Sequence, residues 1–100
     1  MSLGLTTKEV AEITATLCTH DSIKAVVLFG SRATGNFKKT SDVDLALKGK
    51  INFDALTKVA YQLNETTKLP YHFDVVVYDD IDAVLKERID HEGVVIYQKK

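Results

Sequence analysis

The sequence predicts an α/β (α+β) fold, a small mixed β-sheet of about four strands with flanking helices. Short runs of β-branched and apolar residues alternate with segments in which apolar residues recur at helical intervals. The stretch between the second and third runs has the length of a helical crossover, which predicts one parallel pair of strands. Residues 1–100 are expected to form a single domain, because a chain of this length builds one core. The expected strands are Ile23–Phe29, Val43–Leu47, Tyr71–Tyr78 and Val94–Tyr97.

The first helix is expected to begin after Thr6. Thr6 and Glu9 have the spacing of a capping box, in which each side chain bonds the backbone of the other residue. Cys18 falls near the end of this segment, and we expect it to be a buried, inert thiol. As the single cysteine of the chain, it excludes an internal disulfide framework.

Two further helices are expected later in the chain. Asn52 is expected to cap the second helix, and Pro70 prevents its continuation. Asp79 or Asp80 is expected to cap the last helix, which ends at Gly93. The expected apolar face of this last helix consists of Ile81, Val84, Leu85 and Ile89.

The charge of the chain is balanced, with 13 lysines and arginines against 14 aspartates and glutamates. Such a chain offers no extended positive surface to nucleic acid or to an anionic membrane. No apolar run approaches the roughly 18 to 20 residues that span a bilayer. We therefore expect no extended nucleic-acid binding, no membrane association and a cytoplasmic location. Any chemistry that depends on charge must come from a local cluster.

Three aspartates form the candidate cluster. In an extended strand, Asp42 and Asp44 point to the same side, with Cα atoms roughly 6.6 Å apart. At an effective dielectric constant near 20, their charges repel by roughly 2.5 kcal/mol, and a bound cation would turn this repulsion into attraction. Asp74 lies within an apolar strand, which is a costly place for an unpaired charge.

Carboxylates on neighbouring strands would form an oxygen-ligand site of the kind that binds Mg²⁺. Zinc is disfavoured because the chain has no paired cysteines and no closely spaced histidines. An Asp-x-Asp sequence is also common at solvated junctions between loop and strand, and Asp74 alone could pair with a lysine. The scattered histidines, which we expect to have no metal role, are His20, His72 and His91.

Gly30 and Ser31 directly follow the first strand and suggest an anion-binding turn. Glycine lets the backbone approach a ligand, and a serine there can cap a short helix whose free N–H groups point at phosphate oxygens. Arg32, Lys38 and Lys39 add positive charge, although both lysines also suit a solvated loop. A Walker A motif is excluded, because residues 36–37 are Asn and Phe where that motif requires lysine and Ser/Thr.

These motifs closely resemble the DNA polymerase β-like nucleotidyltransferase superfamily. The matching segments are GSRATG at 30–35, SDVDL at 41–45 and FDVVV at 73–77. Their order is the pattern of that superfamily: Gly-Ser, then Asp-x-Asp, then a third strand acid. The size of the chain and the ending IDHEGVVIY resemble the minimal nucleotidyltransferases of the MntA-like antitoxin group, so the nucleotidyltransferase fold is implied.

The resemblance implies a role for each matching residue. Asp42 and Asp44 would bind the metal ions, and Asp74 would bind the second metal and act on the attacking hydroxyl. Gly30 and Ser31 would hold a nucleoside triphosphate, with Arg32 as a supporting phosphate contact. Two Mg²⁺ ions would lower the pKa of the attacking hydroxyl and neutralise charge on the leaving oxygens. ATP or another nucleoside triphosphate would be the substrate.

The resemblance also implies a partner, since the chain has no second domain to bind an acceptor. Minimal nucleotidyltransferases pair with HEPN-domain toxins, so the expected activity is transfer of AMP from ATP to a hydroxyl of a HEPN-type protein. Two alternatives stay open. The chain could be a non-catalytic antitoxin or accessory subunit that acts by binding its partner. It could also modify a small molecule such as an aminoglycoside, or an RNA end.

Overall fold

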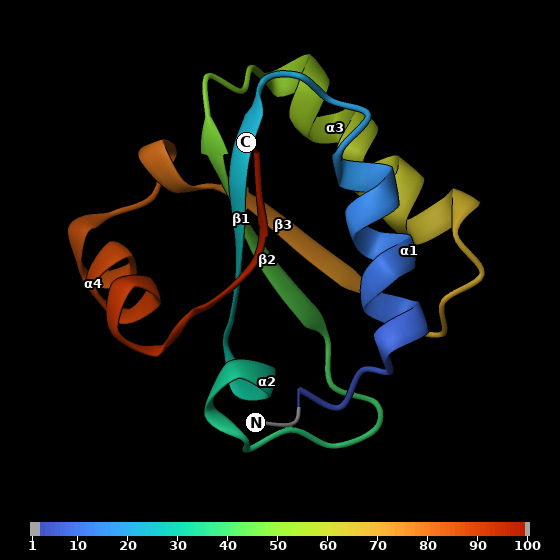
Figure 1. Cartoon of the computed structure of the whole chain (residues 1–100). Coiled ribbons are helices and arrows are strands. Elements are labelled where there is room, and N and C mark those ends of the chain that lie inside the picture. The colour runs from blue at the N-terminus through green and yellow to red at the C-terminus, as the bar shows by residue number, and fades with distance from the viewer. Residues whose placement is uncertain (1–2, 100) are drawn as a thin grey trace.

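The structure is a computed structural model in which residues 3–99 are described, and these residues form a four-stranded mixed sheet. The strand order is β3-β2-β1-β4 (Figure 1). β1 is antiparallel to both β2 and β4, and β2 is parallel to β3. The predicted mixed sheet and its parallel crossover are therefore confirmed. The strands are β1 (Ile23–Phe29), β2 (Val43–Gly49), β3 (Phe73–Val77) and β4 (Val94–Gln98).

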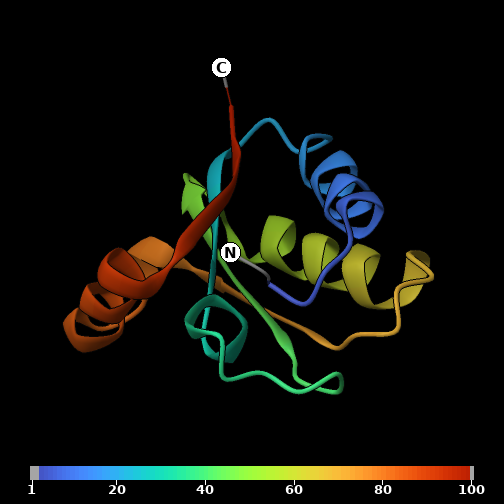
Figure 2. The same ribbon diagram turned by 60° about the horizontal axis from the view of Figure 1, so that its bottom comes forward.

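Helices cover both faces of the sheet. α1 and α3 lie together on one face and α4 lies on the other, while the short α2 sits at one end of the sheet (Figures 1 and 2). A π-helical turn, η1, extends α3, and a 3-10 turn, η2, follows β3. The helical bounds are α1 (Thr7–Leu17), α2 (Ser31–Thr34), α3 (Phe53–Tyr61), η1 (Gln62–Thr66), η2 (Tyr78–Asp80) and α4 (Ala83–Glu92).

Successive side chains of β2 point to opposite faces of the sheet, and each face packs in a different hydrophobic cluster. Leu45 and Leu47 are fully buried in the main core, which also contains buried side chains of α1 and α3. Ala46 belongs to a second, smaller cluster with Val27 of β1 and Ile89 of α4. Because residues two apart share a face, Asp44 lies on the same face as Ala46, the face that α4 covers.

The predicted starts of two helices are confirmed. Thr6 caps α1, and its backbone N–H and side chain exchange hydrogen bonds with Glu9 in a capping box. Asn52 caps α3 by accepting from the Ala55 N–H at 2.8 Å.

The predicted start of the last helix is wrong. Asp82, rather than Asp79 or Asp80, caps α4 by accepting from the Leu85 N–H at 2.8 Å. The two earlier aspartates are used in η2, and Ile81 after them is extended, so the helix begins later than expected. Val84 is 72% exposed and therefore does not share the buried face of α4 on which Ile89 lies.

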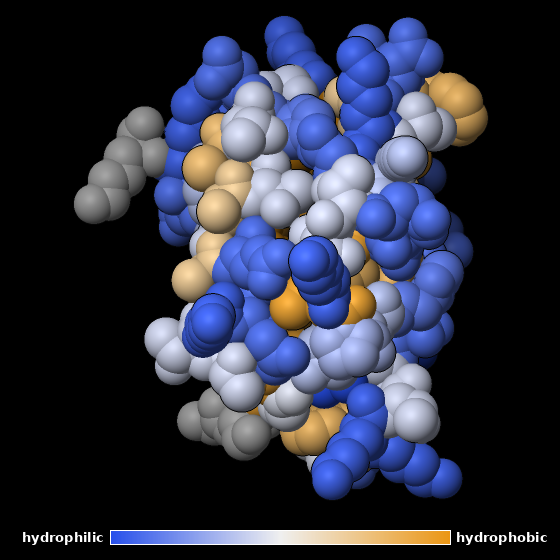
Figure 3. All heavy atoms as spheres, turned by 90° about the vertical axis from the view of Figure 1, so that its right-hand side faces the viewer, coloured by the Kyte–Doolittle hydropathy of each residue, from blue (hydrophilic) through white to orange (hydrophobic). Residues whose placement is uncertain are grey.

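Cys18 is also placed differently from the prediction. It is the C-terminal cap of α1, and its side chain is exposed rather than buried. The surface over α1 and α3 is largely hydrophilic, with small separate hydrophobic patches (Figure 3). Within residues 3–99, no helix has the length and apolar character needed to cross a membrane.

Glu9 is expected to make the stability of the fold depend on pH. The Thr6 backbone N–H donates to Glu9 Oε1 at 2.9 Å, and the Tyr71 hydroxyl donates to both carboxylate oxygens at 3.1 and 3.0 Å. These bonds, with the Thr6 bond having the largest effect, lower the pKa of Glu9 from its ordinary value of 4.5. The stabilisation from charged Glu9 is therefore present above pH 4.5 and lost as the pH falls through the lower folded pKa.

Glu9→Gln, which retains capping ability, tests this link. The urea midpoint of the variant should be lower than that of the wild type at pH 7, and the difference should narrow steadily below pH 4.5. A difference that stays constant from pH 7 to pH 3 would show that the charge of Glu9 has no part in stability.

Candidate active site

The three aspartates predicted from the sequence lie at the same end of the sheet. Asp44 pairs with Phe29 of β1 on one side and with Asp74 of β3 on the other. Asp74 shares the α4 face, because Val76, two residues along β3, packs in the small cluster beneath that helix. Asp42 lies directly before β2. The fold thus gathers residues that are far apart in the sequence.

The three carboxylates influence one another. Asp44 is half-buried, and burial raises the pKa of its carboxyl above the ordinary value of 3.8. The charges of Asp74 and Asp42 raise this pKa further, whereas His72 opposes the shift. Asp42 and Asp74 are both exposed. The cost expected for an unpaired charge within an apolar strand does not arise at Asp74, because this residue is exposed near the start of an edge strand.

The donor set and charge of this cluster fit a hard divalent cation such as Mg²⁺. Within residues 3–99, no lysine or arginine forms an ion pair with any of the three carboxylates, so no such pair offsets their mutual repulsion. In the same part of the chain, no three acidic, histidine or cysteine side chains are already grouped around a common metal position. Exposed aspartates change rotamer at little cost. The negative charge of the three carboxylates and the pairing of Asp44 with Asp74 therefore fit a cation. Binding would need the aspartate side chains to change rotamer so that they surround one position.

Gly30 brings the backbone against the Asp44 carboxylate. Its φ angle is +77°, in the left-handed region that favours glycine. A Cβ at this position would overlap the Asp44 Oδ2 atom and lie 3.2 Å from its Cγ. Gly30 is also the N-cap of α2, and Ser31 is the first helical residue. The prediction that Ser31 caps this helix is therefore wrong, although Ser31 directly follows the glycine that packs on Asp44.

Arg32 is not available to a phosphate, contrary to the expectation from the sequence. Its side chain is 1% exposed and is the buried polar side chain of the described residues. Its guanidinium donates to backbone carbonyls and lies over the rings of Phe37 and Tyr71, 5.2 and 4.7 Å from their centroids. The accepting carbonyls, at 3.0 to 3.4 Å, belong to Leu3, Gly4, Lys39 and Ser41.

Arg32 and Asn64 hold the backbone next to two of the aspartates. Arg32 Nη2 donates to the Ser41 carbonyl at 3.0 Å, one residue before Asp42. The Asn64 amide donates to the Phe73 carbonyl at 3.0 Å and accepts from the Phe73 N–H at 2.7 Å, one residue before Asp74. Sequence reasoning missed Asn64, because its partner is nine residues away and no motif marks the pair.

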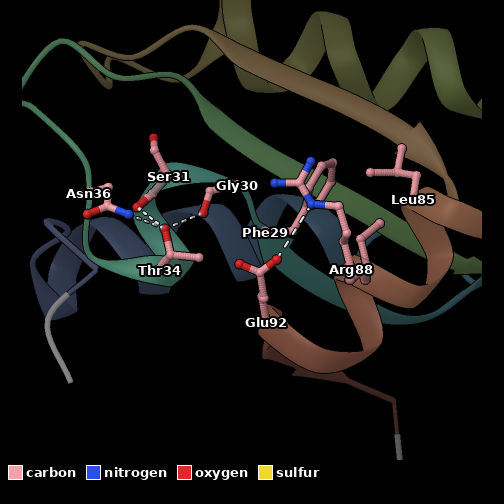
Figure 4. Close-up of a pocket in the computed structure, with 9 residues that line it drawn as sticks. Phe29, Gly30, Ser31, Thr34, Asn36, Leu85, Arg88 and Glu92 are labelled. Atoms are coloured by element: carbon pink, nitrogen blue, oxygen red, sulfur yellow. Dashed lines mark hydrogen bonds and ion pairs between the residues drawn. The ribbon is translucent and has the colours of Figure 1, made fainter.

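A pocket of about 390 Å³ opens between α2 and α4, beside Gly30 and Ser31 (Figure 4). This volume lies within the usual range of small-molecule sites, roughly 300–1,000 Å³. Its apolar wall comes from Phe29, Leu85 and Ile89. Its polar rim comes from Thr34, Asn36, Arg88 and Glu92. The pocket meets the aspartate cluster at Gly30, which contacts both.

Comparison with known proteins supports the same family. The family described as "Polymerase beta, Nucleotidyltransferase" matches residues 11–100. Two proteins of Methanocaldococcus jannaschii, each named "Putative protein adenylyltransferase", are similar in sequence. One is 37% identical over 75 residues, which cover 72% of this chain and 77% of the relative. The other is 36% identical over 55 residues, which cover 55% of this chain and 49% of the relative.

Solved structures share the fold at lower identity. A chain of a toxin-antitoxin crystal structure with AMP-PNP has a TM-score of 0.76 and 21% identity, covering 91% of this chain and 74% of that chain. A chain from the complex of tri-AMPylated Shewanella oneidensis HEPN toxin with MNT antitoxin has a TM-score of 0.69 and 19% identity, covering 90% and 70%. The predicted α+β fold is thereby confirmed.

The family match covers the segments on which the resemblance was based. It spans Gly30 directly after β1, the Asp-x-Asp at the start of β2 and Asp74 of β3. The predicted enzyme class is confirmed together with the fold. This chain belongs to the polymerase β-type nucleotidyltransferase family.

Proposed function

We propose that the chain transfers AMP from ATP to a hydroxyl group of a HEPN-domain partner protein, in a reaction that depends on Mg²⁺, and that it thereby acts as an antitoxin. The observation that carries the proposal is the register of Asp44 against Asp74, with Gly30 packed on the Asp44 carboxylate. The named relatives support protein adenylylation, and the similar toxin-antitoxin structures support a HEPN partner.

Asp42, Asp44 and Asp74 would hold the metal ions, of which we propose two. Bound there, the metal supplies charge neutralisation on the phosphates and a lower pKa for the attacking hydroxyl. Gly30 and Ser31 would place the triphosphate beside the carboxylates. Because Gly30 contacts Asp44, the position of the phosphates would lie directly beside the position of the metal ions.

The chain's own residues would then orient the reaction. The hydroxyl oxygen of the acceptor forms a bond to the α-phosphorus, and the bond from the α-phosphorus to the bridging oxygen of the β-phosphate breaks. AMP is left on the acceptor and pyrophosphate leaves. Asp74, which is exposed at the edge of the sheet, is placed to accept the hydroxyl proton.

The acceptor would come from the partner, with residues 1–100 acting as one minimal domain. Asp42 and Asp74 are exposed, so a side chain of another protein can approach them from solvent. A binding-only antitoxin is the second candidate, because the carboxylates are not yet grouped as metal ligands.

Neutralisation of the toxin in cells separates the two candidates. The HEPN toxin would be expressed with wild-type chain, with Asp74→Asn, or with Asp54→Asn as a matched control on the exposed first turn of α3. We expect the wild type and Asp54→Asn to restore growth and Asp74→Asn to fail at equal protein levels. Full rescue by Asp74→Asn would favour neutralisation by contact.

A further inference from the structure

The pocket beside Gly30 receives its positive charge from α4 rather than from the Gly-Ser-Arg motif. The chain has two arginines, Arg32 and Arg88. Arg32 is buried beneath the loop before β2. Among the described residues that line the pocket, Arg88 alone is cationic. Figure 4 shows its guanidinium directed from α4 into the space beside Gly30.

Arg88 is held by a weak interaction. Its Nε lies 3.6 Å from Glu92 Oε1, one helical turn further along α4. The side chains are 70% and 41% exposed, so this pair is worth little, and a stronger anion can replace it at small cost. A triphosphate is such an anion, since its hydrogen bonds to a guanidinium are assisted by charge and can be bidentate.

The opposite wall of the pocket is polar and closely tied to the Gly-Ser turn. Thr34 Oγ1 donates to the carbonyls of Gly30 and Ser31 at 3.5 and 3.3 Å, and Asn36 Nδ2 donates to Thr34 Oγ1 at 3.4 Å (Figure 4). A phosphate chain beginning at Gly30 would therefore pass between this hydrogen-bonded turn and the exposed guanidinium of Arg88.

We propose that Arg88 binds the β- and γ-phosphates of the nucleotide, exchanging Glu92 for the triphosphate when the substrate enters. This inference rests on the proposed function, and it assigns to α4 the phosphate contact that the motif placed at Arg32. Glu92 competes with the triphosphate for the guanidinium of Arg88, and its carboxylate also repels the negative charge of the triphosphate. Arg88 thereby favours nucleoside triphosphates over monophosphates.

Titration calorimetry with Mg²⁺ would compare the binding of ATP and of AMP to the wild type and to Arg88→Gln. We expect the Kd for ATP to rise about tenfold in the variant, as for one lost charged hydrogen bond, and the Kd for AMP to stay within about twofold. Glu92→Gln, which removes the competitor, should lower the Kd for ATP. Lys86→Gln is the matched control, because Lys86 lies over the Tyr78 ring, 5.5 Å from its centroid, and does not line the pocket.

Each outcome decides the assignment. An unchanged Kd for ATP in Arg88→Gln, with normal binding by the wild type, would overturn the role of Arg88 and leave the proposed function intact. Equal weakening of ATP and AMP would also overturn it, because the contact would then be to the nucleoside or the α-phosphate. Failure of the wild type to bind either nucleotide would overturn the proposed function itself.

Discussion

Replacing Asp44 with asparagine is expected to abolish nucleotidyl transfer and to leave the domain as stable as the wild type or more stable. Asp44 is half-buried, and its charge is repelled by Asp74 and Asp42 without a basic partner in an ion pair within residues 3–99. Asparagine removes that repulsion while keeping the size of the side chain. The rate of transfer should fall more than about a hundredfold. Residues that only hydrogen-bond to metal ligands typically contribute 10- to 100-fold to activity, and a ligand itself should contribute more.

The stability and the transfer activity of Asp44→Asn are measured separately. Urea unfolding in the presence of EDTA gives the stability, and the rate of label transfer to the partner gives the activity. Asp54→Asn, an exposed change in the helix that follows the opposite end of β2 from Asp44, is the control for both. Loss of activity together with a large loss of stability in Asp44→Asn would contradict the account, because Asp44 would then be a structural residue.

Replacing Arg32 with methionine is expected to destabilise the fold by about 3 kcal/mol, since it removes the charged donor from several part-buried hydrogen bonds to backbone carbonyls. The guanidinium accounts for hydrogen bonds to carbonyls of the N-terminal segment and of the loop before Asp42. It also stacks against Phe37 and Tyr71. Methionine keeps part of the packing but donates no hydrogen bond. Thermal and urea unfolding would both measure the loss.

The two arginines provide a direct contrast. Arg88→Gln, at an exposed position, should change the free energy of unfolding by less than about 0.5 kcal/mol. Arg32→Met should instead act mainly on stability and leave the ATP affinity of the remaining folded protein within a few-fold of the wild type. Equal stability of Arg32→Met and the wild type would show that the buried contacts of Arg32 are not needed.

Much of the fold could be predicted because it follows from local pattern. The strand ending at Phe29 is an apolar β-branched run, and the caps at Thr6 and Asn52 depend on residues three positions apart. The aspartate cluster follows from the alternation of side chains on β2 and from one parallel crossover. These features need no knowledge of distant contacts, so the sequence contains them directly.

The remaining features depend on contacts between distant segments. In the sequence, Arg32 resembles a phosphate ligand, but in the structure its hydrogen-bond acceptors are backbone carbonyls. Every residue has a backbone carbonyl, so no sequence motif can indicate which of them Arg32 contacts. The exposure of Asp74 depends on β3 being an edge strand. The place of Arg88 depends on how α4 packs against the sheet beside Gly30. Such positions are set by tertiary packing, which sequence pattern does not specify.

The most direct test of the central claim is the fate of the α-phosphate of ATP. The HEPN partner would be incubated with this chain, Mg²⁺ and ATP labelled at either the α- or the γ-phosphate, and its intact mass would be measured in parallel. We predict that the α-label and the mass of AMP appear on the partner, that the γ-label does not, and that Asp44→Asn transfers neither. Transfer of the γ-label, or a stable complex without any mass gain, would contradict a protein nucleotidyltransferase.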